Sequence, residues 1–327
     1  MKPGYLIATL GCRTNQFESA RLSQDLEELG FEEAGPDRPR VEVALVNTCT
    51  VTHRADKESR QLIRRLARDH PGAKIVVTGC LAQLEGQSLM DLPGVSLVLG
   101  HPEQARFKEM MTRNLTGLWV GALAGRFETT FRTFGRLTGR LRPSPHRTRA
   151  LLKVQDGCSK ACAYCRVRLA RGPSRSLAPD QVLAGVRDLT RAGHQEVVLT
   201  GIHLGGYGRD LRPKLGLADL VQAILDLKAG PRLRLSSLDP NQVSPELLKA
   251  AQASDRFCPH FHLALQSGDP EVLKRMNRPY SPRHFKDQVA AITSGLAQAA
   301  VGADVMAGFP GEDRAAFERT YALIESL

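Results

Sequence analysis

Three cysteines, Cys158, Cys162 and Cys165, stand in a C-x3-C-x2-C spacing directly after an apolar, strand-like segment at 150–154. Thiolates at this spacing can bind three irons of a [4Fe-4S] cluster, and no fourth cysteine follows nearby. A cluster with three protein ligands leaves one iron open to a substrate or cofactor, as open catalytic metal sites do. A zinc site, which usually takes a fourth Cys or His at short spacing, and three unrelated thiols are the alternatives. The spacing therefore favours redox or radical chemistry.

Three further cysteines each follow a strand-like segment in the first part of the chain. Cys12, Cys49 and Cys80 come after segments at 5–10, 41–46 and 74–78, with a fourth strand expected at 95–99. Amphipathic segments at about 16–29 and 53–69 lie between them, and such alternation predicts a parallel sheet. Since ligands bind at the carboxyl edge of such a sheet, we expect these thiols to converge and hold a second cluster. A lone cysteine is also a common core residue, and that alternative stays open.

The rest of the chain positions these two groups. We predict an N-terminal α/β domain at 1–112, a basic linker rich in Gly, Thr and Arg at 113–147, and a second α/β domain at 148–327. The linker could follow a phosphate backbone or be a solvated connection. In the second domain strands are expected near 150–154, 196–200, 233–236, 262–265 and 300–306, with helices between them. This pattern predicts a partial β/α barrel with its active site at the carboxyl ends of the strands.

Composition limits the partners and the compartment. The chain has 327 residues, a formal net charge of +11 and no apolar run of the roughly 20 residues that span a bilayer. It shows no signal peptide, so a cytoplasmic protein without a membrane partner is expected. Cysteines in that compartment favour metal or cluster ligation over disulfides. The positive charge favours a polyanion such as nucleic acid, although basic enzymes that bind none are the alternative.

These residues resemble a known family. Cys158, Cys162 and Cys165 match the cluster motif of radical S-adenosylmethionine (SAM) enzymes. Cys12, Cys49 and Cys80 resemble the N-terminal domain of the methylthiotransferases. Other matching segments, which bring the resemblance to nearly the whole chain, are GCRTN at 11–15, NTCTVT at 47–52, RGPSRS at 171–176, QSG at 266–268 and GFPGE at 308–312. The resemblance implies a partial radical SAM barrel after the N-terminal parallel-sheet domain.

Within that family, the segment TGIHLGGYG at 200–208 resembles the type that acts on threonylcarbamoyladenosine in tRNA, as do RTNQ at 13–16 and TVT at 50–52. Methylthiotransferases that act on isopentenyladenosine in tRNA or on an aspartate of a ribosomal protein are the alternatives. The family continues past Leu327 into a sixth barrel strand and a C-terminal RNA-binding domain, and the resemblance implies that this chain lacks both. A truncated homologue that binds clusters or RNA without catalysis therefore remains a further alternative.

The resemblance implies two [4Fe-4S] clusters, with the six cysteines as ligands, and SAM as cofactors. It implies that a SAM-derived radical activates carbon 2 of the adenosine at position 37, in the tRNA anticodon loop, and that an electron donor such as flavodoxin or ferredoxin supplies the cluster. We expect contacts to SAM from Tyr164, Thr200, Gly201, Ser237 and Gln266, and contacts to the substrate from His203, Arg275 and Arg278. Each could instead be an ordinary core aromatic, turn residue, loop histidine or surface arginine.

Three residues fall outside the pattern. Arg168 stands where the family commonly has a proline after the third cysteine, and Asp239 stands where a glutamate is usual after a pair of serines. The shorter Asp239 side chain puts a contact to SAM or substrate in question. Cys258 lies outside both cysteine groups, and we predict that it is a core thiol.

Overall fold

The structure, a computed structural model, describes residues 2–35, 40–115 and 148–327. It divides into two compact units. The described residues of the first unit lie within Met1–Gly139 and Arg166–Pro173, and those of the second within Arg140–Cys165 and Ser174–Leu327. The short segment Arg166–Pro173 thus groups with the first unit although it follows the predicted boundary at 148. Most of the predicted linker, 116–147, lies outside the described residues, and the predicted domain boundaries stay a prediction.

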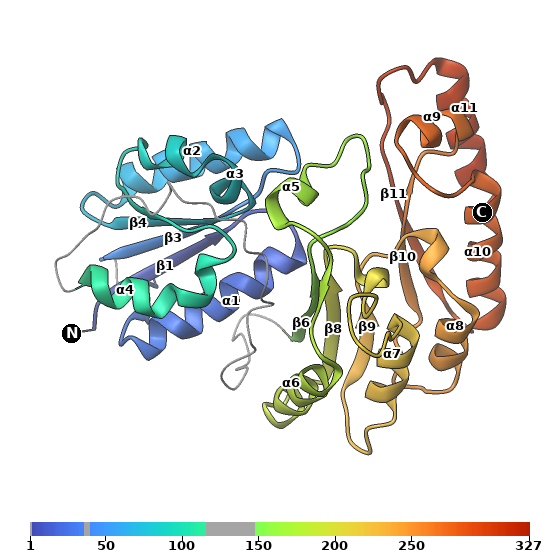
Figure 1. Cartoon of the computed structure of the whole chain (residues 1–327), viewed down its shortest axis with the longest axis horizontal. Helices are drawn as coiled ribbons and strands as arrows, with labels where there is room; N and C mark the ends of the chain where they lie inside the picture. Colours follow the sequence, from blue (N-terminus) through green and yellow to red (C-terminus); the bar gives the residue numbers. More distant parts are fainter. Residues whose placement is uncertain (1, 36–39, 116–147) are drawn as a thin grey trace. The chain divides into compact units, whose positions relative to one another are not determined.

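The first unit is a five-stranded parallel sheet with helices on both faces (Figure 1). Its strand order is β2-β1-β3-β4-β5. The strands are β1 (Gly4–Thr9), β2 (Glu32–Glu33), β3 (Val43–Thr48), β4 (Lys74–Gly79) and β5 (Val95–Val98). The helices are α1 (Arg13–Glu28), α2 (His53–Asp69), α3 (Cys80–Met90), η1 (Glu103–Arg106), α4 (Phe107–Leu115) and α5 (Val167–Arg171). The predicted parallel sheet is therefore confirmed, with the strands near their expected positions.

Two apolar cores, one on each face, hold this sheet between its helices. Leu22, Leu26, Phe107 and Met111, from α1 and α4, pack on one face. Ile63, Leu66, Leu81 and Leu89, from α2 and α3, pack on the other. The central strand β3 is buried at all six positions, as expected for a parallel strand covered on both faces. This two-sided packing fixes the carboxyl ends of β1, β3 and β4 at one edge.

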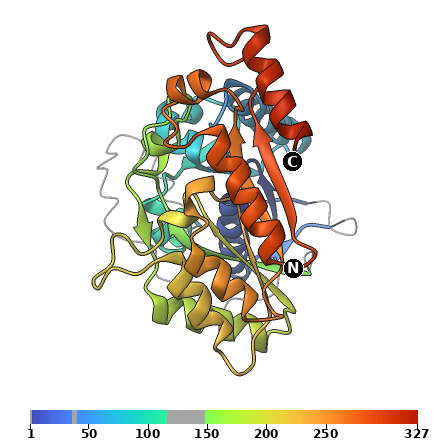
Figure 2. The same cartoon turned by 90° about the vertical axis from the view of Figure 1, so that its right-hand side faces the viewer.

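The second unit is a curved row of mostly parallel strands with its helices on the outside (Figures 1 and 2). The strands are β6 (Arg149–Asp156), β7 (Arg175–Ser176), β8 (Glu196–Gly201), β9 (Arg232–Leu235), β10 (His260–Gln266) and β11 (Ala300–Val305). The longer helices are α6 (Pro179–Arg191), α7 (Leu217–Leu225), α8 (Pro245–Gln252), α9 (Pro270–Arg275), α10 (Pro282–Gly295) and α11 (Arg314–Glu325). The short 3₁₀ turns η2 (Leu204–Gly206) and η3 (Pro240–Gln242) follow β8 and β9.

The pairing of these strands gives a partial barrel. Strands run in the order β7-β6-β8-β9, and β10 pairs with β11. Parallel bridges between Leu233 and Phe257 and between Leu238 and Leu263 connect the β9 segment to the β10 segment. The five predicted strands are confirmed, and the antiparallel β7, only two residues long, is an addition that no periodicity indicated. None of the helices in the described ranges is long and apolar enough to cross a membrane.

Candidate functional site

The structure brings Cys12, Cys49 and Cys80 together at the carboxyl edge of the first sheet. Cys12 directly precedes α1, Cys49 follows β3, and Cys80 is the first residue of α3 after β4. The Cys12 sulfur lies close enough to both other thiols for its charge to act on them. Gly11, at φ +97°, approaches Cys49 so closely that a Cβ there would lie 2.9 Å from the Cys49 sulfur. Cys12 thus lies near two thiols that come from other strand ends.

Burial raises the pKa values of two of these thiols, Cys80 and Cys49. It raises the pKa of Cys80 to about 12, while the Arg171 guanidinium opposes part of that rise. Burial also raises the pKa of Cys49, partly offset by a hydrogen bond from the Val51 backbone. Thiols with raised pKa values carry protons at neutral pH, so binding a metal here would release them.

Asparagine side chains hold the loops that carry these cysteines. Asn15 Nδ2 donates to the carbonyls of Leu10, at 2.9 Å, and Thr48, at 3.0 Å, which tie the ends of β1 and β3 together. Asn47 Nδ2 donates to the Asn15 carbonyl at 2.9 Å. Both asparagines are buried. The sequence contained them in the matching segments GCRTN and NTCTVT, but only the fold shows that they fix the loops of Cys12 and Cys49.

The second group, Cys158, Cys162 and Cys165, lies on the loop after β6 in the second unit. The Cys158 sulfur accepts a hydrogen bond from the Lys160 backbone at 3.4 Å, and the Cys165 backbone donates to the Cys162 carbonyl at 3.1 Å. Burial raises the pKa of Cys158, and the nearby sulfurs of Cys162 and Cys165 raise it further. These three thiols also face one another.

The loop after α9 forms hydrogen bonds with this cysteine loop. Asn277 Nδ2 donates to the Ala161 carbonyl at 2.9 Å, and the Ala163 backbone donates to the Met276 carbonyl at 3.1 Å. Arg278 Nη1 lies 3.4 Å from the Cys162 sulfur and donates to it. A residue predicted to contact the substrate is therefore placed beside a candidate cluster ligand, with its side chain buried rather than on the surface.

Asp239 lies at the centre of a charged group beside this loop. Its carboxylate accepts hydrogen bonds from Lys160 and Arg278, and His203 Nε2 lies 3.6 Å away. Burial acts to raise the pKa of Asp239, but His203, Arg278 and Lys160 outweigh it and hold that pKa well below its ordinary range. The Asp239 side chain, although shorter than the usual glutamate, thus reaches two cations at once. His203 also contacts Gln242 from the η3 turn.

The remaining predicted residues lie on strand ends, on the cysteine loop and at the end of a helix in the same unit. Tyr164 packs edge-to-face on Phe309, with ring centroids 6.4 Å apart, and burial raises the pKa of its hydroxyl. Thr200 and Gly201 end β8, and Gln266 ends β10 with a positive φ of 66°. Ser237 is exposed just after β9. Arg275 is exposed, and its guanidinium donates to the Gly311 carbonyl at 2.8 Å.

The positive φ at Gln266 is notable because a side chain with that backbone conformation carries strain of about 1–3 kcal/mol. Such strain is typical of functional sites. Cys258, by contrast, is fully buried and lies near Glu196 and Arg234, which confirms the prediction of a core thiol.

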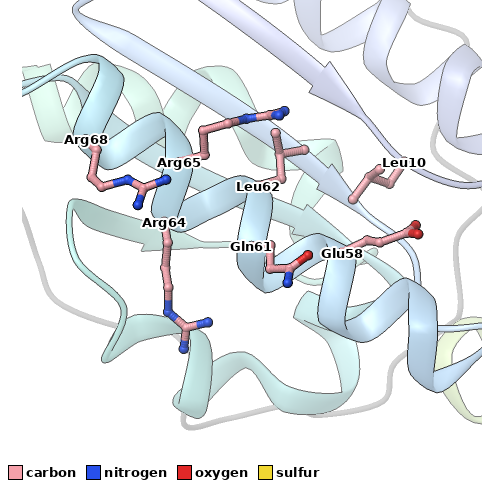
Figure 3. A pocket seen from close by; sticks show the side chains of 7 residues that line it. All are labelled: Leu10, Glu58, Gln61, Leu62, Arg64, Arg65 and Arg68. Carbon is pink, nitrogen blue, oxygen red and sulfur yellow. The ribbon is translucent and has the colours of Figure 1, made fainter.

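A hollow of about 530 Å³ on the first unit is lined by arginines of α2 (Figure 3). Its walls are Leu10, Glu58, Gln61, Leu62, Arg64, Arg65 and Arg68. The three arginine side chains are exposed on the outer face of the helix. Leu10 immediately precedes Gly11 and Cys12, so this basic surface begins next to the loop of the first thiol group.

Comparison with known proteins decides the family. Residues 4–100 match the family described as "Uncharacterized protein family UPF0004", and residues 152–324 match the Radical SAM superfamily. A protein of Bacillus subtilis named "Threonylcarbamoyladenosine tRNA methylthiotransferase MtaB" is 35% identical over 97% of this chain and 69% of its own length. One of the same name from Thermotoga maritima is 35% identical over 98% of this chain and 71% of its own length. The chain belongs to the radical SAM methylthiotransferase family.

This methylthiotransferase has the expected fold of a radical SAM enzyme. The structure of the radical SAM methyltransferase TsrM from Kitasatospora setae superposes with a TM-score of 0.70 at 16% identity, covering 98% of this chain and 71% of TsrM. The methylthiotransferase takes SAM and a [4Fe-4S] cluster as cofactors, and a second cluster is proposed below. Its two sets of three thiols, each set gathered on strand-end loops, fit clusters with three protein ligands each.

Nowhere in the described parts of the chain do three His, Cys, Asp or Glu side chains meet in the geometry of one bound metal ion. A cluster binds each thiolate to a different iron, so its ligands lie further apart than those of one ion. Which cysteines ligate stays a prediction, and it is tested below.

Proposed function

We propose that this methylthiotransferase adds a methylthio group to carbon 2 of N6-threonylcarbamoyladenosine at position 37 of tRNA. The observation that carries the proposal is that one chain contains two separate groups of three thiols. Its curated relatives are named threonylcarbamoyladenosine tRNA methylthiotransferases. The segment at 200–208 favours this nucleoside over isopentenyladenosine, and its residues 202–208 also disfavour an aspartate of a ribosomal protein.

In this proposal each unit has its own task. Cys158, Cys162 and Cys165 hold the cluster that binds SAM, and Cys12, Cys49 and Cys80 hold the cluster that carries the sulfur to be transferred. When bound, these cofactors supply a carbon radical and a methylthio group. The chain itself positions each cluster site, because the backbone of each cysteine loop is held in place and would determine the direction of the open iron.

Several side chains position SAM and the substrate in this proposal. Tyr164, held by Phe309, offers its ring to the adenine of SAM, and the strand ends at Thr200, Gly201, Ser237 and Gln266 offer polar groups to the rest of that molecule. His203, held by Asp239 and Gln242, and the exposed Arg275 are the proposed substrate contacts. Arg278 is engaged by Asp239 and Cys162, so its contacts favour a role in holding the cluster loop.

A tRNA anticodon loop suits such a site, because unpaired bases can be splayed out and stacked on protein side chains. The basic hollow on α2, with Arg64, Arg65 and Arg68, offers guanidinium groups to the phosphate backbone of the same tRNA. A flavodoxin or ferredoxin is the proposed source of electrons. A tRNA substrate and such a donor place the enzyme in the cytoplasm.

The test is to measure modified nucleosides by mass spectrometry in tRNA from cells that lack the gene. We expect the methylthio form of threonylcarbamoyladenosine to disappear and the unmodified form to accumulate. Wild-type protein should restore the product, Cys49→Ala should not, and the control Cys258→Ala, which removes a buried thiol outside both groups, should.

Other outcomes identify the alternatives. Loss of methylthio-isopentenyladenosine would identify the other tRNA substrate, and a mass change in a ribosomal protein would identify the aspartate. Unchanged tRNA and ribosomal proteins would indicate a non-catalytic homologue. Restoration by Cys49→Ala would contradict a second cluster that delivers sulfur.

A further inference from the structure

Arg171 is a fully buried arginine at the end of the five-residue helix α5. Its Nη1 donates to Glu18 Oε1 at 2.8 Å and its Nη2 donates to Glu18 Oε2 at 3.0 Å, so the pair is bidentate. The same Nη2 donates to Asn15 Oδ1 at 2.8 Å. Glu18 is also buried. Removing two charges from water costs free energy even when the charges are paired. A fully buried ion pair is therefore not explained by stability alone.

The neighbours of this pair are the three thiols of the first unit. Arg171 makes a hydrogen bond to the Cys80 thiol, and its charge acts on Cys49 as well. Asn15 Oδ1, which accepts from Arg171, also accepts from the Cys12 sulfur at 3.7 Å. The guanidinium therefore acts directly on Cys80 and Cys49, and it shares the acceptor Asn15 Oδ1 with Cys12.

The way α5 packs supports a role beyond stability. The helix packs on α3, the helix that begins at Cys80. Only Ala170 and Arg171 of its five residues are buried, and Leu169 is 59% exposed. A helix that needed only to cover the sheet would place an apolar side chain at position 171, since a buried ion pair is often matched or exceeded in stability by apolar residues of similar volume.

We infer that Arg171 is a positioning residue for the cluster held by Cys12, Cys49 and Cys80: it hydrogen-bonds the ligand sulfur of Cys80 and sets the charge around that cluster, with Glu18 as its counter-charge. The inference rests on the proposed second cluster. Hydrogen bonds to cluster sulfurs and nearby charge are established controls of the reduction potential of iron–sulfur clusters. A cation beside the cluster favours the added electron, and an anion disfavours it.

The two members of the pair therefore predict opposite shifts. Arg171→Met removes the cation and the donor, and we expect the reduction potential of the N-terminal cluster to become more negative. Glu18→Gln keeps the shape of the side chain but removes the anion, and we expect the potential to become more positive. Arg171→Lys keeps the charge without the bidentate geometry, so its potential should lie between those of Arg171→Met and the parent.

The experiment uses the full chain with Cys158, Cys162 and Cys165 changed to Ala, so that only the N-terminal cluster is measured. After anaerobic reconstitution, iron content, the electron paramagnetic resonance spectrum of the reduced cluster and its potential are compared among the variants. Arg60→Met is the matched control, because Arg60 is a half-buried arginine of the same unit whose partners are Glu85 and Ser88. Its spectrum and potential should equal those of the parent.

The outcomes separate this inference from the proposed function. Opposite shifts in Arg171→Met and Glu18→Gln, with Arg60→Met unchanged, would support it. Should Arg171→Met fail to fold, Arg171→Lys takes its place: a potential more negative than that of the parent would support the inference, and a parent-like potential would overturn it. Parent-like potentials and spectra, with only a lower melting temperature, would make Arg171 a structural ion pair and overturn the inference. A parent that binds no iron would overturn the proposed second cluster, and this inference with it.

Discussion

Asp239 gives the sharpest prediction about what holds the candidate SAM site together. Its side chain is 9% exposed, and its carboxylate accepts hydrogen bonds from Lys160 and Arg278. Asp239→Asn keeps the size of the side chain and removes its charge. Arg278, with a side chain only 6% exposed, is then left as a buried cation without its counter-charge. Lys160 is 22% exposed and can turn toward water, so its share of the loss is small.

The magnitude follows from the burial of Arg278. Removing one partner of a buried ion pair costs about 3–5 kcal/mol, and the partial exposure of Lys160 places the expected loss at the lower end, about 3 kcal/mol. For a unit of this size, that loss lowers the melting temperature by about 6–12 °C. Circular dichroism during anaerobic thermal unfolding measures it directly.

The control is Asp188→Asn. Asp188 pairs with Arg191 at 2.9 Å, but the Arg191 side chain is 74% exposed. Exposed pairs contribute about 0–1 kcal/mol, so the midpoint of this variant should move little. A midpoint for Asp239→Asn within 2 °C of the Asp188→Asn midpoint would refute the reasoning that Arg278 depends on this charge.

The same network has a defined pH dependence. The pKa of Asp239 is lower in the folded protein than its ordinary value near 4, so its contribution to stability is present above about pH 4. That contribution is lost as the pH falls through the folded-state pKa, because the carboxylate must then be protonated. The difference in melting temperature between wild type and Asp239→Asn should stay constant from pH 5 to 8 and shrink below pH 4. A difference that grew on acidification would contradict the assignment.

Two further perturbations test the first unit. Gly79→Ala should lower the melting temperature more than Gly72→Ala: both glycines have positive φ, at a cost of about 1 kcal/mol for Ala, but only at Gly79 would the new Cβ lie 2.3 Å from the Thr48 carbonyl oxygen. Equal effects would show that the backbone around Cys80 yields to the clash. The second variant combines Arg64→Gln, Arg65→Gln and Arg68→Gln, which replaces the three arginines that line the hollow. It should bind tRNA more weakly, and the slope of log affinity against log salt concentration should fall by about 2–3. Binding titrations at several salt concentrations measure both. The control is a variant with Gln at three arginines that already pair with carboxylates, which are Arg54, Arg106 and Arg191. If the slope of the hollow variant equals the slope of this control, the tRNA binds elsewhere.

The sequence by itself determined which residues gather at each strand edge. Cys12, Cys49 and Cys80 follow three strands of a parallel sheet, and parallel strands joined by helices all end at the same edge. Their convergence therefore needed only the alternation of strands and helices. The local spacing of Cys158, Cys162 and Cys165 likewise requires no tertiary information, because a short loop keeps three thiols within reach of one cluster.

Only the tertiary structure decided which charged residues serve these sites. Arg171 meets Glu18 across 153 positions of sequence, and Arg278 meets Asp239 across 39. From the sequence, both arginines only added to the positive charge of the chain, and Arg278 was expected to contact the substrate. A charge on a helix or loop pairs with whatever carboxylate the packing brings to it. That partner depends on how distant elements pack, and no local spacing or periodicity records it.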